Sequence, residues 1–317
     1  MNAITWLPIS TLALFALTAC DGGSIETTTS TGSQTTSGSG GSASTGTTTG
    51  TGGDAGDTLT LTMAPFTIPP GGEVYRCQNF ANPFGGADAD VSKFESHMTG
   101  GSHHLLLFYK DGAVDGVDPN CNGLEFAATP YSTQIPDDSL DFPAGVAALV
   151  PAKTGFRLQS HYLNTTNKPI EAHVEVKLHL AKPATVTDHA GVLFVPEYMF
   201  AIPPNSTQVV NHTCNLPFDM NLLKANSHMH KHGTHFDAKI NKEMVFETTT
   251  WDEPESAIFA PAKPVKGGTK LDFNCTFVNN SANTLTFGES AETNEMCIFV
   301  ASFYPVPAGE QVTVGCQ

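Results

Sequence analysis

The chain has 317 residues, with 15 Lys and Arg against 31 Asp and Glu, so its formal net charge is −16. Binding to nucleic acid needs clustered cations that neutralise phosphates, and this balance excludes nucleic acid as an expected partner. No Lys/Arg cluster in the sequence predicts a site for lipid head groups either. The acidity itself is typical of a solvated surface.

The N-terminal residues 1–19 are apolar and small and predict an export signal. The run is too short for a membrane-spanning helix, which needs about 20 apolar residues with suitable flanks. It ends in Leu17-Thr18-Ala19-Cys20, which resembles a bacterial lipobox. We therefore expect Cys20 to carry a lipid that anchors the protein to the periplasmic or cell-surface side of a bacterial membrane without spanning it. An ordinary secretory signal is the alternative.

The segment that follows, residues 20–57, is rich in Gly, Ser and Thr. It has few apolar side chains to offset the entropy lost on ordering, so we predict a disordered tether. About 260 residues remain, which is enough for one large or two medium domains.

Short runs of β-branched and aromatic residues alternate with polar ones in this remaining part, and turn residues interrupt them. Period-two alternation of this kind predicts antiparallel strands. The clearest runs are residues 105–109, 156–162, 174–180, 270–273 and 297–304. We predict an all-β protein of two tandem antiparallel β-sandwich domains, jelly-roll-like, over residues 58–183 and 184–317.

Six cysteines remain when Cys20 is set aside. They are Cys77, Cys121, Cys214, Cys275, Cys297 and Cys316. An even number in an exported chain predicts three disulfides, because the compartment is oxidising. Their spacing alone does not choose among the possible connectivities.

Two local histidine clusters predict a metal site. Residues i and i+2 of a strand point to the same face, so His228 and His230 are suited to bind one ion together. The adjacent His103 and His104 would point to opposite faces of a regular strand. Both reach one metal only at a twisted end or a bulge, which the preceding residues 100–102, Gly-Gly-Ser, permit.

Two further residues are candidate ligands only in the company of these clusters. His161 lies inside an expected strand, where a single histidine is more often a core or surface residue. Met296 alone would be a core residue beside the structural Cys297. Near a histidine pair it becomes a candidate copper ligand, because a thioether is a soft ligand that suits Cu(I) and rarely binds zinc or iron(II).

Four motifs in order over residues 72–317 resemble the copper type II, ascorbate-dependent monooxygenases, the family of peptidylglycine alpha-hydroxylating monooxygenase and dopamine beta-monooxygenase. The motifs are His103-His104 before Leu105-Leu106-Leu107-Phe108, then Phe156-Arg157-Leu158-Gln159-Ser160-His161-Tyr162, His228-Met229-His230, and Glu295-Met296-Cys297. The resemblance implies two coppers per chain, one on each sandwich, facing each other across an open, solvent-filled cleft.

The resemblance also implies roles for these residues. His103, His104 and His161 would hold the electron-storing copper. His228, His230 and Met296 would hold the copper at which O2 is reduced, and these three would be the catalytic ligands. Ascorbate or another one-electron reductant would be the co-substrate, and a substrate C–H bond would be hydroxylated. Tyr75 and Gln159 match family residues close to the ligands.

Disulfide pairing is implied by the resemblance as well. The family pattern pairs Cys77 with Cys121, Cys214 with Cys316, and Cys275 with Cys297. The last bridge would fix Met296 in place.

Some positions depart from the family pattern. Asn226 stands where the peptide-hydroxylating enzyme has an Arg that anchors the substrate carboxylate, and Ile298 and Val300 stand where it has Asn and Tyr. An apolar or uncharged small substrate is therefore expected in place of peptidylglycine. Three additional histidines, His97, His232 and His235, are expected to be solvated or next to ligands, with His232 as a competing ligand.

The sequence thus predicts a copper-dependent monooxygenase of unknown substrate and oligomeric state. A copper-binding or copper-delivering lipoprotein without turnover is the alternative that the same ligands allow. A cupin-like iron dioxygenase is disfavoured, because no glutamate follows His230 in residues 231–238.

Overall fold

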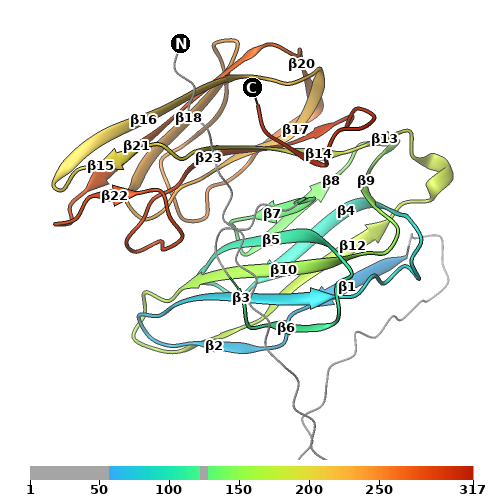
Figure 1. Cartoon of the computed structure of the whole chain (residues 1–317), viewed down its shortest axis with the longest axis horizontal. Helices are drawn as coiled ribbons and strands as arrows, with labels where there is room; N and C mark the ends of the chain where they lie inside the picture. The colour runs from blue at the N-terminus through green and yellow to red at the C-terminus, as the bar shows by residue number, and fades with distance from the viewer. Residues whose placement is uncertain (1–56, 122–127, 317) are drawn as a thin grey trace, which may run out of the picture. The chain divides into compact units, whose positions relative to one another are not determined.

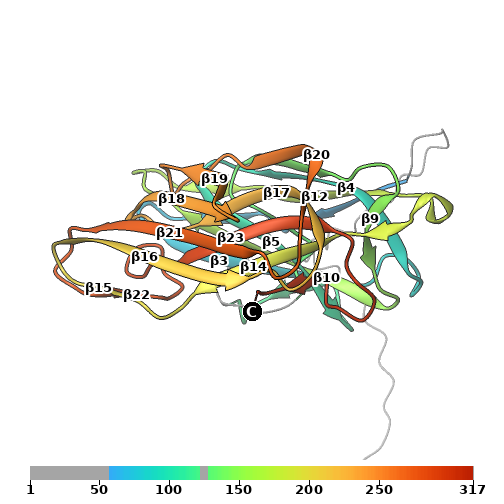
Figure 2. The same ribbon diagram turned by 90° about the horizontal axis from the view of Figure 1, so that it is seen from above.

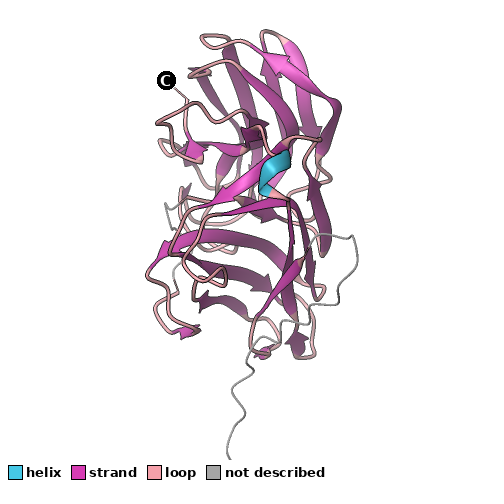
Figure 3. Ribbon diagram, turned by 90° about the vertical axis from the view of Figure 1, so that its right-hand side faces the viewer, coloured by secondary structure: helices cyan, strands magenta, loops and turns pink. Residues whose placement is uncertain are grey.

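The computed structural model describes residues 57–121 and 128–316. The expected signal peptide, Cys20 and nearly all of the expected tether lie outside these residues. Within them, the regular structure is almost entirely strand, and the helical segment is a short 3-10 turn at Pro183–Thr185 (Figure 3). No helix in the described part of the chain is long and apolar enough to cross a membrane. The prediction of an all-β sandwich fold is confirmed.

The strands before residue 190 form the first sandwich. They are β1 (Thr58–Thr62), β2 (Phe66–Ile68), β3 (Glu73–Phe80), β4 (Ala89–Met98), β5 (Ser102–Asp111), β6 (Gly116–Asp118), β7 (Tyr131–Thr133), β8 (Asp137–Asp141), β9 (Val146–Val150), β10 (Thr154–Leu163), β11 (Ile170–Ala172), β12 (Val174–Leu180) and β13 (Asp188–His189). One sheet has the order β1-β12-β4-β9-β13, with β8 also on β4, and the other has the order β6-β3-β10-β5-β7 (Figure 1). A two-stranded sheet pairs β11 with β2.

The later strands form the second sandwich. They are β14 (Gly191–Glu197), β15 (Ala201–Ile202), β16 (Ser206–Asn215), β17 (Met220–His228), β18 (Gly233–Ile240), β19 (Glu243–Thr248), β20 (Ala257–Val265), β21 (Lys270–Asn279), β22 (Leu285–Thr286), β23 (Cys297–Tyr304) and β24 (Thr313–Val314). Its sheets have the orders β20-β17-β23-β14-β24 and β16-β21-β18-β19, with a small β15-β22 pair. Figure 2 shows β16 beside β21 and β14 beside β23, as their antiparallel registers require.

Each sandwich has its own hydrophobic core. Phe94, Leu107 and Leu158 lie in the first core, and Phe273 and Phe299 lie in the second. The five runs that predict strands from sequence fall in β5, β10, β12, β21 and β23. The predicted boundary between domains at Ala184 stays a prediction, and β13, which follows it, still pairs with β9 of the first sandwich.

Strand β10 is buried along its whole length. Alternate side chains such as Phe156 and Leu158 enter the first core, while Gln159 and His161 point to the opposite face of the sheet and are also fully buried. Both faces of this sheet are therefore covered, and polar side chains on the outer face need partners.

Three disulfides lie in the described part of the chain. They join Cys77 to Cys121, Cys214 to Cys316, and Cys275 to Cys297, which are the pairs that the resemblance implies. The third bridge ties the first residue of β23 to β21, so it fixes the backbone next to Met296.

Candidate metal centre

The His103-His104 pair sits at a β-bulge. In the pairing of β5 with β10, His161 opposes His104 and Tyr162 opposes Ser102, so His103 is the extra residue. The ring nitrogens of His103, His104 and His161 lie within 4.8 Å of one another. The distortion that the sequence requires for two adjacent ligands is therefore present.

The second histidine pair lies at the end of β17. His228 is the last residue of the strand and His230 follows it, while Met229 between them is 1% exposed and packs into the core. The expected i, i+2 arrangement therefore holds. Gly233 is required next to it, because a Cβ there would lie 2.8 Å from the Cβ of Met229.

The two predicted ligand groups form one cluster of five histidines, which we call the histidine cluster. Ring nitrogens of His103, His228 and His230 also lie within 4.8 Å of one another, so His103 belongs to both groups. The ring centroids of His103 and His228 are 4.7 Å apart, and those of His104 and His228 are 5.1 Å apart. This differs from the open, solvent-filled cleft that the resemblance implies.

Polar contacts between the two sandwiches explain this closeness. Gln134 donates from Nε2 to the Ser227 carbonyl, and Lys224 forms an ion pair with Asp138. The Tyr75 hydroxyl donates to the Glu289 carbonyl at 2.6 Å. The Thr129 amide donates to Thr313 Oγ1 at 2.7 Å. Glu73 on β3 also accepts hydrogen bonds from the Ala291 amide and the Ser290 hydroxyl, at 2.7 and 2.8 Å.

Four of the five imidazoles have one nitrogen engaged by an orienting acceptor. On the first sandwich, His161 Nε2 donates to Glu73 Oε1 at 2.9 Å, and His104 Nε2 donates to Gln159 Oε1 at 3.4 Å. On the second, His228 Nδ1 donates to Gln134 Oε1 at 2.6 Å, and His230 Nδ1 donates to the Asn294 carbonyl at 3.2 Å. Histidines that ligate metals show this pattern, because the acceptor fixes the tautomer and directs the other nitrogen to the ion.

Five of the six remaining ring nitrogens are buried and lack hydrogen-bond partners among the described residues. They are Nδ1 of His104 and His161, Nε2 of His230, and both nitrogens of His103. Buried polar atoms without partners are costly. Groups of three ring nitrogens within 4.8 Å of one another fit bound metal ions, and imidazole is a ligand that suits copper.

Burial also sets the protonation of the cluster. Desolvation, and then the neighbouring imidazoles, lower the pKa of His103 and His228 well below the ordinary value. Desolvation likewise lowers the pKa of His104, and it lowers that of His230 to about 3. The cluster is therefore neutral at neutral pH, and neutral imidazole is the form that binds metals.

Tyr75 and Gln159, the two positions expected near the ligands, contact the cluster. The Tyr75 ring stacks on His161 with centroids 3.8 Å apart, and Gln159 faces His104. Glu73 was not expected from the sequence. Burial alone would raise its pKa, but hydrogen bonds from His161, Ala291 and Ser290 outweigh burial and hold the pKa at about 2.

Met296 lies beside the cluster and is 3% exposed, in the lining of a cavity that His104 and His228 also line. The preceding Glu295 is fully buried and accepts the backbone N–H groups of His230 at 2.9 Å and His232 at 2.7 Å. Burial raises the pKa of Glu295 to about 8. Glu295 therefore attaches the loop after β17 to the segment that carries Met296.

The additional histidines lie apart from the grouped ligands. His97 is at the surface and donates to Asp137, and His235 pairs with Glu247. His232 has a buried Nε2 without a hydrogen-bond partner, but within the described residues it belongs to none of the groups of candidate metal ligands.

Sequence reasoning missed several residues of the centre. They are Glu73, Gln134, Asn294 and Trp251, whose ring centroid lies 5.4 Å from that of His103. None belongs to the histidine motifs, and no local pattern marks them. Glu295, by contrast, was visible as part of Glu295-Met296-Cys297.

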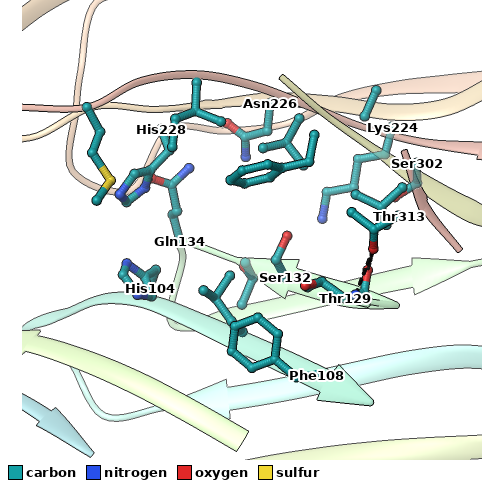
Figure 4. A pocket seen from close by; sticks show the side chains of 18 of the residues that line it. His104, Phe108, Thr129, Ser132, Gln134, Lys224, Asn226, His228, Ser302 and Thr313 are labelled. Atoms are coloured by element: carbon teal, nitrogen blue, oxygen red, sulfur yellow. Dashed lines mark hydrogen bonds between the residues drawn. The ribbon is translucent and has the colours of Figure 1, made fainter. Parts of the chain in front are cut away.

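A cavity of about 330 Å³ extends away from the histidine cluster. Figure 4 shows His104, His228 and Gln134 at one end, and Lys224, Ser302 and Thr313 at the other. A largely apolar cavity of this size with a few polar groups is typical of a small-molecule site.

Comparison with known proteins gives one informative match. Residues 188–315 match the family model described as copper type II ascorbate-dependent monooxygenase, C-terminal domain. This stretch contains His228, His230 and Met296.

Two solved structures show weak likenesses to this chain. The major capsid protein P2 from bacteriophage PM2 is 7% identical, with a TM-score of 0.28, over 80% of this chain and 99% of that chain. A cupin 2 conserved barrel domain protein from Leptotrichia buccalis is 5% identical, with a TM-score of 0.17, over 79% of this chain and 91% of that chain. Neither likeness carries an argument about function.

Proposed function

We propose that the protein is a copper-dependent monooxygenase that uses O2 and a one-electron reductant such as ascorbate to hydroxylate a C–H bond of a small molecule. The observation that carries the proposal is the histidine cluster, whose buried, neutral imidazoles form two overlapping groups of ring nitrogens, with Met296 in the lining of the adjoining cavity. The match of residues 188–315 to a copper monooxygenase domain supports it.

The donor sets suit two coppers per chain. His103, His104 and His161 would hold one, and His228, His230 and Met296 would hold the other. Copper supplies one-electron redox chemistry and activation of O2 when it is bound. We assign catalysis to the second set, because its thioether favours the reduced ion.

The chain's own residues orient the ligands and exclude water. Gln134 accepts the Nδ1–H of His228 and so presents Nε2. Glu73 and Gln159 accept from the Nε2–H groups of His161 and His104 and so present Nδ1. Because these side chains are held before metal binds, little reorganisation accompanies binding.

We also propose that the protein is exported and anchored by a lipid on Cys20, with residues 21–57 as the tether between the membrane and the β-sandwiches. Radiolabelled palmitate supplied to the host should label the wild type and not a Cys20→Ser variant, which should be released from membranes. Equal labelling of both would refute the anchor.

Copper content tests the proposed function first. The protein reconstituted with excess copper and then desalted should hold two coppers per chain, and a His228→Ala/His230→Ala variant should hold one. The matched control, His97→Ala/His235→Ala at surface positions, should keep two. One copper or none in the wild type, or a preference for zinc, would favour a copper-binding or delivery protein and overturn the enzyme.

Turnover separates the enzyme from a carrier with intact sites. Ascorbate and O2 should be consumed in fixed proportion to a hydroxylated product. Binding of two coppers with no such coupling across candidate substrates would support the carrier.

A further inference from the structure

The cavity beside the histidine cluster has one apolar wall from the first sandwich. Leu106 and Phe108 follow His104 at i+2 and i+4 on β5, so all three point to the same face of the sheet. Leu105 and Leu107 point the other way, into the first core. This wall therefore consists of the candidate ligand His104 followed by the apolar side chains of Leu106 and Phe108.

The opposite wall comes from the second sandwich and is also apolar. Ile298 and Val300 follow Met296 at i+2 and i+4, and Phe194 lies on the neighbouring strand β14, where it opposes Val300. A molecule in the cavity would thus lie between two apolar surfaces, with Met296 and His228 at one end.

The end of the cavity away from Met296 offers no uncompensated charge. Lys224 is the charged side chain in its lining, apart from histidines, and its Nζ pairs with Asp138 from the first sandwich. Both side chains are nearly buried, 8% and 10% exposed. A ligand with a charged group at this end would therefore bring an unpaired charge beside a lysine that is already paired, and it should bind more weakly than an uncharged ligand.

The side chain of Asn226, which stands where the peptide-hydroxylating enzyme has its anchoring Arg, already makes hydrogen bonds within the protein. Its Nδ2 donates to Ser256 Oγ at 2.8 Å and to the Pro254 carbonyl at 3.3 Å, and its Oδ1 accepts from the Ser227 amide at 2.7 Å. Its side-chain amide therefore has little hydrogen-bonding capacity left for a ligand carboxylate, although Asn226 lines the cavity.

Uncharged polar groups gather at the end away from Met296. Ser302 and Thr313 lie there beside the Lys224 ammonium, and Ser132 lies on the facing side (Figure 4). Hydroxyl groups both donate and accept, so they suit a ligand hydroxyl or carbonyl.

We propose that this cavity binds an uncharged, predominantly apolar small molecule with one hydroxyl or carbonyl group. Its hydrocarbon end lies beside Met296 and His228, and its polar end lies beside Lys224 and Ser302. This inference rests on the proposed function and names its substrate class. The reaction at the hydrocarbon end balances as R–H + O2 + 2 e⁻ + 2 H⁺ giving R–OH + H2O, with the electrons from the one-electron reductant.

Three probes that share one apolar body test the charge preference. 4-Phenyl-1-butanol, 4-phenylbutanoate and 4-phenylbutylammonium would each be titrated into the full chain by calorimetry, with and without bound copper. The alcohol should bind with a Kd at least tenfold lower than either ion. If an ion binds as tightly as the alcohol, or if the alcohol does not bind, the proposal is wrong.

A cavity-filling variant tests the location. Val300→Phe, which adds volume to the second wall, should weaken binding of the alcohol at least tenfold while copper content and Tm stay unchanged. The matched control is Val209→Phe at an exposed position of β16, which should bind the alcohol as the wild type does. Ile298→Phe from the same wall replaces Val300→Phe if that variant does not fold. Wild-type affinity in a folded wall variant would rule out this cavity.

Different results would refute the proposed monooxygenase activity and the proposed substrate class. Selective binding of the alcohol by a chain that holds fewer than two coppers would leave the cavity assignment intact and overturn the monooxygenase. Two coppers together with preferred binding of an ion would overturn only the substrate class.

Discussion

In four of the five histidines of the cluster, a single acceptor decides which nitrogen is presented. His228 presents Nε2 because Gln134 accepts from its Nδ1, and His161 presents Nδ1 because Glu73 accepts from its Nε2. These acceptors lie 94 and 88 residues away in the chain. At the residue scale, the tautomers of His161 and His228 are therefore fixed by residues outside the histidine motifs.

Replacing Gln134 with Leu should weaken one copper site. His228 would lose its acceptor and its fixed tautomer, so the affinity of this site for copper should fall roughly 10–100-fold. Competition with a chelator would measure the affinity of each site. Gln208→Leu, on β16 in the far sheet of the second sandwich, is the control and should match the wild type. An unchanged affinity in Gln134→Leu would mean that the acceptor does not orient His228.

Replacing Met296 with Ile should separate catalysis from folding. The branched side chain preserves apolar volume but removes the thioether, so the fold and the three-histidine site should persist while O2-dependent product formation is lost. Thermal unfolding, copper content and product analysis would be compared with the wild type. Hydroxylation at the wild-type rate would show that Met296 is not a ligand of the oxygen site.

Two local irregularities shape the centre at the scale of strands. The bulge in β5 places His103 and His104 in reach of one point, and the end of β17 places His230 beyond the last paired residue. The segment before β23 brings Met296 to the same place, and the bridge between Cys275 and Cys297 ties it to β21. Strands of regular geometry would have separated these ligands.

Removing the Cys275–Cys297 bridge should affect the Met296 side of the centre selectively. The bridge spans 22 residues, so its loss should cost about 3 kcal/mol of stability. A Cys275→Ala/Cys297→Ala variant should also lose copper from the Met296 site before the three-histidine site. Denaturant titration and copper content would record both effects.

The control for this variant is removal of the bridge between Cys214 and Cys316, which lies away from Met296 in sequence. This bridge spans 102 residues, so Cys214→Ala/Cys316→Ala should lower stability by more, about 4.7 kcal/mol, but leave the copper affinities intact. Equal loss of copper in both variants would indicate general loosening of the second sandwich.

At the scale of the whole molecule, contacts between the sandwiches assemble the histidine cluster and the cavity. Gln134 and Asp138 from the first sandwich reach Ser227 and Lys224 of the second. Glu73 joins His161 to the loop before Met296. This assembly buries the imidazoles of the cluster, and burial keeps them neutral.

The metal-free protein should therefore lose stability as the pH falls from 7 to 5. In the unfolded chain the cluster imidazoles take up protons near their ordinary pKa of 6.5, while burial holds the folded pKa lower, at about 3 for His230. The unfolded state then binds more protons, so stability is present above about pH 6.5 and is lost towards pH 3. The slope is about 1.4 kcal/mol per pH unit for each such histidine.

Urea unfolding at several pH values would measure this dependence. His103→Leu should reduce the slope by the share of one histidine, while the surface variant His97→Gln should keep the wild-type slope. A pH-independent free energy of unfolding between pH 7 and 5 would contradict the burial of neutral imidazoles.

The sequence by itself determined the local chemistry of this protein. Period-two alternation predicted the strands, because side-chain direction in a strand follows from the backbone. The spacing of His228 and His230 predicted a shared face, and the adjacency of His103 and His104 predicted a distorted strand, which the bulge supplies. The kind of donor atom at these positions and at Met296, imidazole nitrogen or thioether sulfur, follows from the side chains alone.

Only the tertiary structure decided how close the two ligand groups lie and what surrounds them. Gln134, Glu73 and Lys224 carry no local signal, because their roles depend on partners that the fold brings from distant segments. The same holds for the apolar walls of the cavity, which come from separate sandwiches. Hydrogen bonds and packing between the sandwiches, not spacing along the chain, set these features.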